Sequence, residues 1–376
     1  MEKEVKNPFI LGGYHSADYF CDRESKLAAL NNHLHNERNV VLFSWRRLGK
    51  SALIKRFLSE KEKSAKIEVI YIDLLASRNM DQAVELIVEA VFKRFGRSEE
   101  KSISDSFSSL MQALGLSLSF DPHSGHPNFT LGLSGKKSGE QSLRSIGEFL
   151  SNRKKQVVIA IDEFQQVSRY TEQNGEAVFR SFMQEFPTLR FIFSGSHRKL
   201  MTAMFSDSNR PFYKSCSMLA LGPIPRTSYF PFIKRHFNED GREIGDDILK
   251  RVYYWSEGQT YSIQLLCNRL FGLGREPSME SLEELINEIL EEESPVFSNY
   301  FHLLPKMQWK VLKAIAKERR VENPLAKNFL RSHELGAASS VSTAIKSLEE
   351  KEMLAWEEGK YFVHDLIFSR WLERRI

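Results

Sequence analysis

Short apolar runs alternate with longer amphipathic stretches across the first 200 residues of the chain. The runs are rich in β-branched and aromatic residues, and their length suits strands that are buried on both faces of a parallel sheet. They occupy residues 40–43, 69–74, 157–161 and 190–193. Between them, apolar residues recur with helical spacing over 50–61, 80–95, 143–153 and 177–186. This alternation predicts an α/β fold over residues 1–221, a doubly wound parallel sheet covered by helices.

Residues 98–139 interrupt the alternation with a segment rich in serine and glycine. Residues 116–120 and 128–133 alternate like two strands on either side of the turn-forming sequence DPHSGHP. We interpret the segment as a surface insertion that resembles a β-hairpin. A disordered linker is the alternative that the composition leaves open.

After Leu221-Gly222-Pro223 the strand-like runs stop and the pattern becomes helical. Helical spacing covers 226–237, 245–256, 261–270 and 279–293, which predicts a small helical domain over residues 222–298.

The last part of the chain, residues 299–376, predicts a third domain. Three helices are expected at 306–319, 324–333 and 339–352, the third with a serine at its N-cap. Two short strands, 353–356 and 361–363, follow around a turn at Glu358-Gly359. Three helices followed by a β-hairpin are typical of a winged helix-turn-helix.

Composition narrows the class of protein. Of the 376 residues 41% are hydrophobic, enough to build more than one core. The three cysteines, Cys21, Cys216 and Cys267, are far apart, which favours a reducing compartment over disulfides or zinc. The N-terminus is charged and no apolar run approaches the length that spans a bilayer, so we expect a cytoplasmic protein without a membrane segment. A net charge of +4 is too small to indicate a nucleic-acid binder.

The sequence VVLFSWRRLGKSALIKRF, residues 40–57, has the order strand, tight loop and helix start. This order suits a phosphate site, because backbone N–H groups and a helix N-terminus converge on an anion. Lys50 would contact the β- and γ-phosphates of ATP, and the Ser51 hydroxyl would coordinate Mg²⁺. The alternative is a chance Gly-Lys-Ser. The expected nucleotide-binding residues of the loop are Ser44, Trp45, Arg46, Arg47, Leu48, Gly49, Lys50, Ser51 and Ala52.

A second motif, QVVIAIDEF, is an apolar strand that ends in Asp162-Glu163. Such a strand carries its carboxylates to the sheet edge where the phosphate loop also opens. Asp162 can hold Mg²⁺ together with Ser51, and Glu163 can orient and deprotonate the attacking water. Taken alone, this motif could also be an exposed acidic pair without catalytic function that follows a buried strand.

A third strand, in LRFIFSGSHRKL, also ends in polar residues. If it lies between the first two motifs, Ser194 and Ser196 can sense the γ-phosphate or the lytic water, and His197 is a weaker candidate. An ordinary serine cap on the following helix explains Ser196 almost as well.

The order YFCDRESKLAAL, SWRRLGKSALIKRF, VVIAIDEFQ, FIFSGSHRKLM, RPFYKS and LALGPI resembles the archaeal-type ATPases of the STAND class, within the AAA+ branch of P-loop NTPases. The pairs Arg23-Glu24 and Arg46-Arg47 carry the narrower part of the resemblance. It implies that a helical lid and a winged helix follow the ATPase domain. It also implies that the segment around Phe20–Glu24, including Arg23, encloses the adenine together with the lid.

The chain departs from the family pattern at three places. Ser44 replaces the first glycine of the loop, and Ser215 stands where the family has a finger arginine, with Lys214 and Arg210 as substitutes. Thr260 replaces a proline at the start of a lid helix. Since an arginine finger contributes on the order of 10³-fold or more to hydrolysis, these departures predict slow turnover.

The expected winged helix carries 14 Lys and Arg against 10 Asp and Glu between Tyr300 and Ile376. Lys346 and Lys351 are offset by Glu349, Glu350 and Glu352. Because non-specific DNA affinity depends on many uncompensated cations, the pattern favours packing on the ATPase or a protein partner.

Together these patterns predict a Mg²⁺-dependent ATP-binding protein with slow ATPase activity that acts as a nucleotide-controlled switch. One alternative is an ATP-dependent DNA-binding protein similar to origin-recognition ATPases. The other is a scaffold that keeps ADP bound and does not hydrolyse ATP. An oligomer is compatible with each of the three.

Overall fold

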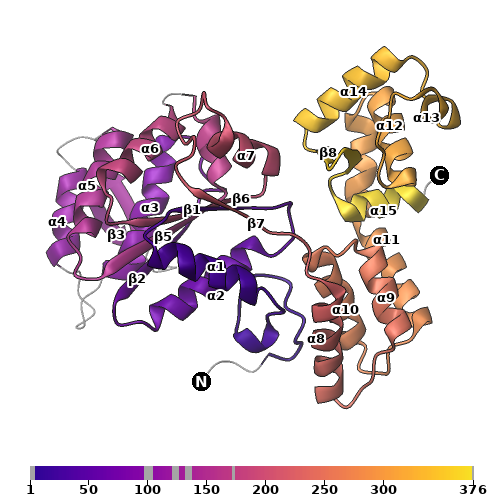
Figure 1. Cartoon of the computed structure of the whole chain (residues 1–376), viewed down its shortest axis with the longest axis horizontal. Coiled ribbons are helices and arrows are strands. Elements are labelled where there is room, and N and C mark those ends of the chain that lie inside the picture. The colour runs from indigo at the N-terminus through magenta and orange to yellow at the C-terminus, as the bar shows by residue number, and fades with distance from the viewer. Residues whose placement is uncertain (1–4, 97–104, 121–126, 132–137, 172–173, 375–376) are drawn as a thin grey trace. The chain divides into compact units, whose positions relative to one another are not determined.

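The structure is a computed structural model that describes residues 5–96, 105–120, 127–131, 138–171 and 174–374 (Figure 1). The chain divides into two compact units, Met1–His236 with Glu257–Asn268 and Phe237–Ser256 with Arg269–Ile376. The helices of the predicted small helical domain, 222–298, are divided between these units. The three-domain boundaries therefore stay a prediction.

The first unit is built on a five-stranded sheet with the strand order β2-β5-β6-β1-β7, in which all neighbours run parallel. Its strands are β1 (Val40–Phe43), β2 (Ile67–Asp73), β5 (Gln156–Asp162), β6 (Arg190–Gly195) and β7 (Ser217–Ala220). The doubly wound parallel sheet predicted from the sequence is confirmed.

Helices cover both faces of this sheet, because alternate strand residues pack into two separate cores (Figure 1). Val40 and Leu42 pack with the helices α1 (Glu24–His35) and α2 (Lys50–Glu62). On the opposite face, Val41 and Phe43 pack with a larger layer. This layer comprises α3 (Met80–Phe95), α4 (Asp105–Leu114), α5 (Gly139–Ser151), η2 (Phe164–Arg169), α6 (Gly175–Glu185) and α7 (Arg198–Ser206). Burial on both faces explains why the strands read as continuous apolar runs.

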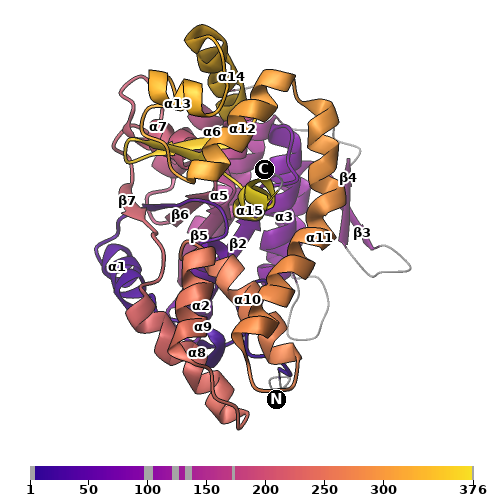
Figure 2. The same ribbon diagram turned by 90° about the vertical axis from the view of Figure 1, so that its right-hand side faces the viewer.

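The predicted insertion contains a helix as well as strands. α4 packs on the core through Phe107, Leu110, Met111 and Leu114, and the hairpin interpretation missed it. β3 (Leu116–Phe120) and β4 (Pro127–Leu131) pair antiparallel as a sheet of their own, which Figure 2 shows apart from the main sheet. Residues 121–126 of the predicted turn DPHSGHP and residues 132–133 of the second predicted strand lie outside the described residues.

The second unit contains α9 (Asp246–Trp255), α11 (Met279–Leu303) and the winged-helix elements. α8 (Arg226–Glu239) and α10 (Thr260–Gly272) both contain a unit boundary, and η1 (Ala17–Tyr19) lies in the first unit. The winged-helix elements are α12 (Lys306–Glu318), α13 (Lys327–Ser332), α14 (Ala338–Glu350), β8 (Leu354–Glu357), β9 (Lys360–Val363) and α15 (Leu366–Arg374).

Three helices followed by an antiparallel hairpin are present as predicted, and a bridge between Val321 and Tyr361 extends the small sheet. The predicted serine cap of the third helix is wrong. α14 begins one residue earlier, with Ala337 at its N-cap position and no capping side chain among the described residues. Within the parts of the chain that the structure describes, no helix is both long enough and apolar enough to cross a membrane.

A glycine on α5 gives the first test of the packing. A Cβ built on Gly147 would lie 2.1 Å from the Phe186 ring, so Gly147→Ala must displace a buried side chain. Overpacking of this kind costs about 1–3 kcal/mol, which exceeds the gain of about 1 kcal/mol from replacing a helical glycine. We expect a lower midpoint of thermal unfolding. Gly222→Ala is the control, because a Cβ there has open space, and equal midpoints for the two variants would contradict the packing.

Candidate functional site

Three polar segments meet at the carboxyl edge of the parallel sheet. The loop 44–49 follows β1, Asp162 and Glu163 stand at the end of β5, and Ser194 and Ser196 stand at the end of β6. The strand order places β6 directly between β5 and β1, as the sequence predicted. The three motifs are therefore neighbours in space although more than 100 residues separate the first from the second.

The loop before α2 has a backbone that can receive an anion. Arg47 (φ +65°) and Gly49 (φ +86°) adopt left-handed conformations, which turn the chain sharply into the helix. Gly49 occupies the N-cap position, and no side chain among the described residues caps the helix there. The first turn, Lys50-Ser51-Ala52-Leu53, contains no carboxylate. The N–H groups and the dipole of a 13-residue helix are thus left for a negatively charged ligand.

Lys50 is a buried cation, with 6% of its surface exposed. Its Nζ donates to Ser44 Oγ at 3.3 Å and to the Trp45 carbonyl at 3.5 Å, and both acceptors are neutral. Burial lowers the pKa of Lys50 below its ordinary value, while Asp162 and Glu163 act in the opposite direction. Ser44, the residue that replaces the loop glycine, thus accepts a hydrogen bond from the buried ammonium.

The Asp162 carboxylate is buried and accepts hydrogen bonds from three elements. Ser51 Oγ on α2 donates to Oδ2 at 2.5 Å, and Tyr71 on β2 donates to the same oxygen at 2.9 Å. Ser194 on β6 donates to Oδ1, as does the Glu163 N–H at 3.0 Å. The adjacent hydroxyl and carboxylate of Ser51 and Asp162 are hard oxygen donors of the kind that Mg²⁺ takes.

Tyr71 was missed in the sequence because it lies inside an apolar-looking strand. Burial, together with the neighbouring Asp162 charge, raises the pKa of Tyr71 far above its usual value. The phenol therefore keeps its proton and remains a hydrogen-bond donor to the carboxylate.

The Glu163 side chain is held by two donors. Its Oε2 accepts from Ser196 Oγ at 2.8 Å and from the amide of Gln165, a second residue that sequence reasoning missed. Gln165 reaches this position because Gly195 has no side chain, since a Cβ there would lie 2.3 Å from Gln165 Oε1. The serine-cap interpretation of Ser196 is wrong, because His197 caps α7 by accepting from the Leu200 N–H at 3.2 Å.

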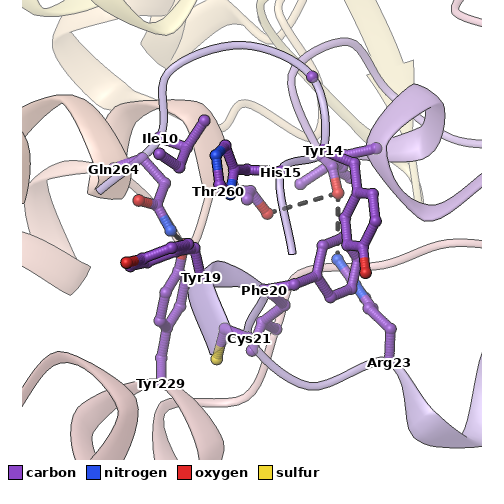
Figure 3. Close-up of a pocket in the computed structure, with 15 residues that line it drawn as sticks. Ile10, Tyr14, His15, Tyr19, Phe20, Cys21, Arg23, Tyr229, Thr260 and Gln264 are labelled. Atoms are coloured by element: carbon purple, nitrogen blue, oxygen red, sulfur yellow. Dashed lines mark hydrogen bonds between the residues drawn. The ribbon is translucent and has the colours of Figure 1, made fainter. Parts of the chain in front are cut away.

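A pocket extends from the loop toward the N-terminal segment, α8 and α10 (Figure 3). The empty space within it, open solvent included, is about 500 Å³. Its walls combine aromatic and apolar side chains with a few polar groups. The lining residues are Ile10, Gly13, Tyr14, His15, Tyr19, Phe20, Cys21, Arg23, Leu48, Gly49, Ala52, Ile224, Tyr229, Thr260 and Gln264.

Arg23 and Thr260 join the pocket to the loop. The Arg23 guanidinium donates to the Leu48 carbonyl at 3.1 Å, and Thr260 Oγ1 donates to the same oxygen at 3.4 Å (Figure 3). Both the Phe20–Arg23 segment and the start of α10 therefore border the loop. The resemblance implied that these two segments enclose adenine, and this role stays a prediction.

A sequence model described as an ATPase domain found predominantly in Archaea matches residues 20–266. The chain belongs to this ATPase family. A second model, a probable winged helix domain, matches residues 295–374. No curated protein matches the sequence at a significant level.

Solved structures share the fold of this ATPase. A Walker-type ATPase of Pyrococcus abyssi is 18% identical, with a TM-score of 0.68 over 98% of this chain and 100% of that one. The ORC1 protein of Aeropyrum pernix in complex with DNA is 14% identical, with a TM-score of 0.54 over 98% and 96%. The ORC2 protein of the same organism, solved as ADPNP–ADP complexes, is 12% identical, with a TM-score of 0.55 over 94% of each chain.

The two loop arginines and the residues near the expected finger position differ in exposure and in their partners. Arg46 and Arg47 are exposed, and the Arg47 guanidinium lies 5.0 Å from the centre of the Tyr261 ring. Arg210, a substitute for the missing finger arginine, pairs instead with the buried Glu176, with Nε at 3.2 Å from the carboxylate. Ser215 donates to the Phe212 carbonyl at 2.7 Å. Arg210 therefore has a structural role within its own chain.

The buried charge of Lys50 gives a stability test. Because the pKa of Lys50 is lowered in the folded chain, its charge destabilises the nucleotide-free protein at neutral pH, and the penalty disappears as the pH rises toward the ordinary value of 10.5. We expect Lys50→Met to raise the free energy of unfolding by on the order of 1 kcal/mol at pH 7. Thermal unfolding without nucleotide measures the change, and the gain should shrink toward pH 10.

Lys63→Met is the matched control for this test, since Lys63 is exposed at the other end of α2 and its loss should change stability little. A Lys50→Met protein that is less stable than wild type at pH 7 would show that the buried ammonium is already compensated.

Proposed function

We propose that this ATPase binds Mg·ATP at the loop 44–52, hydrolyses it slowly and uses the nucleotide state as a conformational switch. One observation carries the proposal. The buried Lys50 ammonium and the uncapped N-terminus of α2 meet the carboxylates of Asp162 and Glu163 at one edge of the sheet. Opposite charges arranged in this way suit a polyphosphate together with a divalent cation.

The binding roles follow from the contacts. Lys50 exchanges its neutral acceptors, Ser44 Oγ and the Trp45 carbonyl, for phosphate oxygens, which relieves the cost of its burial. Ser51 and Asp162, whose side chains lie within hydrogen-bond distance of each other, would hold Mg²⁺ through their oxygen atoms. When bound, the metal neutralises charge on the phosphates. Backbone N–H groups of the loop up to Ala52 position the β-phosphate.

The hydrolytic roles belong to Glu163 and the two serines of β6. Glu163 orients and deprotonates the attacking water, with Oε2 fixed by Ser196 and Gln165. Ser194 and Ser196 sense the nucleotide through the acids that they touch. Turnover is slow because Arg210 is paired with Glu176 and Ser215 has no charge.

The switch is assigned to α10. Its first residues are bonded to the phosphate loop, since the Tyr261 N–H donates to the Arg47 carbonyl at 3.0 Å and Thr260 donates to Leu48. The same helix continues past Asn268 into the second unit of the chain. A change in the loop on hydrolysis therefore reaches the winged-helix unit through a continuous helix.

Replacing the base tests the catalytic assignment. Glu163→Gln should bind ATP with unchanged affinity, while phosphate release falls about 10²- to 10⁴-fold because the amide cannot accept a proton. Glu148→Gln, an exposed substitution on α5, is the control and should turn over like wild type. Equal turnover in wild type and Glu163→Gln would remove Glu163 as the base. ATP binding without any wild-type turnover would instead support the ADP scaffold.

DNA binding is the second candidate, because the similar ORC1 structure is a complex with DNA. The charges of this winged helix argue for a protein contact. Arg319 pairs with Glu373 at 3.3 Å, Lys360 pairs with Glu322 at 3.1 Å, and Lys351 donates to Gln308 at 2.7 Å. Trp356, on the wing strand β8, exposes 55% of its surface, which suits an apolar partner better than phosphates.

Fluorescence anisotropy with a labelled DNA duplex separates the two candidates. We expect weak binding that ATP does not strengthen, because the cations Arg319 and Lys360 are paired with carboxylates of the same domain. The measurement is made at low and at physiological ionic strength, with and without Mg·ATP. ATP-dependent affinity that falls steeply with salt would favour the DNA-binding function.

A further inference from the structure

The pocket beside the phosphate loop has two chemically different ends. Figure 3 shows Arg23 and Gln264 at opposite ends of it. The Arg23 end adjoins the loop, because both Arg23 and Thr260 donate to the Leu48 carbonyl. A nucleotide whose phosphates occupy the loop would therefore extend its base toward Gln264.

The spacing along α10 supports this direction. Thr260, which contacts the loop, and Gln264 are four residues apart and share one face of the helix. Four residues rise about 6 Å along a helix, so Gln264 stands roughly one turn beyond the phosphate loop. Tyr19 and Tyr229 lie beside Gln264 in this part of the pocket, whereas Tyr14 and Phe20 lie beside Arg23 (Figure 3).

The amide of Gln264 is only half satisfied. Its Nε2 donates to the Tyr229 hydroxyl at 3.1 Å, and 8% of the residue is exposed. Its Oε1 is buried and has no hydrogen-bond partner among the residues that the structure describes. Tyr229 is fully buried, and burial raises its pKa well above the usual value, so its hydroxyl keeps its proton. A buried amide oxygen without a partner is costly unless a ligand supplies the donor.

We propose that Gln264 selects adenine at this site. Its Oε1 accepts a hydrogen bond from the 6-amino group, and its second N–H donates to an adjacent ring nitrogen, the two-bond pattern by which glutamine recognises adenine. Guanine presents a carbonyl oxygen in place of that amino group and would face Oε1 with a second acceptor. This inference rests on the proposed function, since it requires the phosphates in the loop.

His15 also lines the pocket, and its Nδ1 has no hydrogen-bond partner in the described part of the chain. A single ring nitrogen cannot reproduce the paired acceptor and donor of an amide. His15 therefore serves as the control within the pocket for a second unsatisfied polar atom.

The test compares ATP with purine riboside triphosphate, which lacks only the 6-amino group, by isothermal titration with Mg²⁺ present. Wild type should bind ATP about tenfold tighter or more, because without the amino group the buried Gln264 Oε1 is left with no donor. Gln264→Leu should bind the two ligands within about twofold of each other, because the group that distinguishes them is gone. The exposed substitution Gln184→Leu should keep the wild-type ratio, whereas a preference lost in His15→Phe but kept in Gln264→Leu would overturn the assignment.

Equal affinities in wild type, a wild-type preference for GTP, or an unchanged ratio in Gln264→Leu would each overturn the assignment of Gln264. If Gln264→Leu does not fold, Gln264→Glu replaces it. Its carboxylate still accepts from the amino group, so it should retain the preference for ATP, and loss of that preference would contradict the proposal. A wild-type protein that binds neither ligand would overturn the proposed function, and this inference with it.

Discussion

The Asp162 carboxylate is the interaction on which the rest of the site depends. It ends β5, an inner strand of the sheet, is 1% exposed, and accepts hydrogen bonds from Ser51, Tyr71, Ser194 and the Glu163 N–H. One buried charge thus fixes the start of α2 and the ends of two neighbouring strands. A carboxylate at this depth is tolerable because it accepts these four hydrogen bonds.

Lys50 differs from Asp162 because its hydrogen-bond acceptors are neutral. Its buried charge lowers the stability of the fold unless a bound anion compensates it. A buried charge of this kind lowers the stability of the folded chain and favours ligand binding, which is common at functional sites. The Gln264 amide at the other end of the pocket is similar, because its buried Oε1 has no hydrogen-bond donor among the described residues. Lys50, whose acceptors are neutral, and Gln264, whose Oε1 has no partner among the described residues, therefore mark the two ends of the proposed ligand.

Local pattern predicted the elements that are buried on both sides. β1 and α3 have the bounds expected from the sequence, and the acids after β5 lie where the motif placed them. Tyr71 could not be predicted, because its contact with Asp162 depends on the parallel pairing of β2 with β5. β7 was missed because an edge strand with alternating exposure is short and only half apolar. The pairing of Arg210 with Glu176 likewise depends on the packing of distant segments, which no motif encodes.

A structure of the wild-type protein with Mg·ADP tests the central claim most directly. The account predicts the β-phosphate at the N-terminus of α2, with Lys50 Nζ on phosphate oxygen in place of Ser44 Oγ, and Ser51 Oγ on the metal. The base should lie against Gln264. A nucleotide bound elsewhere, or a bound nucleotide with Lys50 still held by Ser44 and the Trp45 carbonyl, would contradict it.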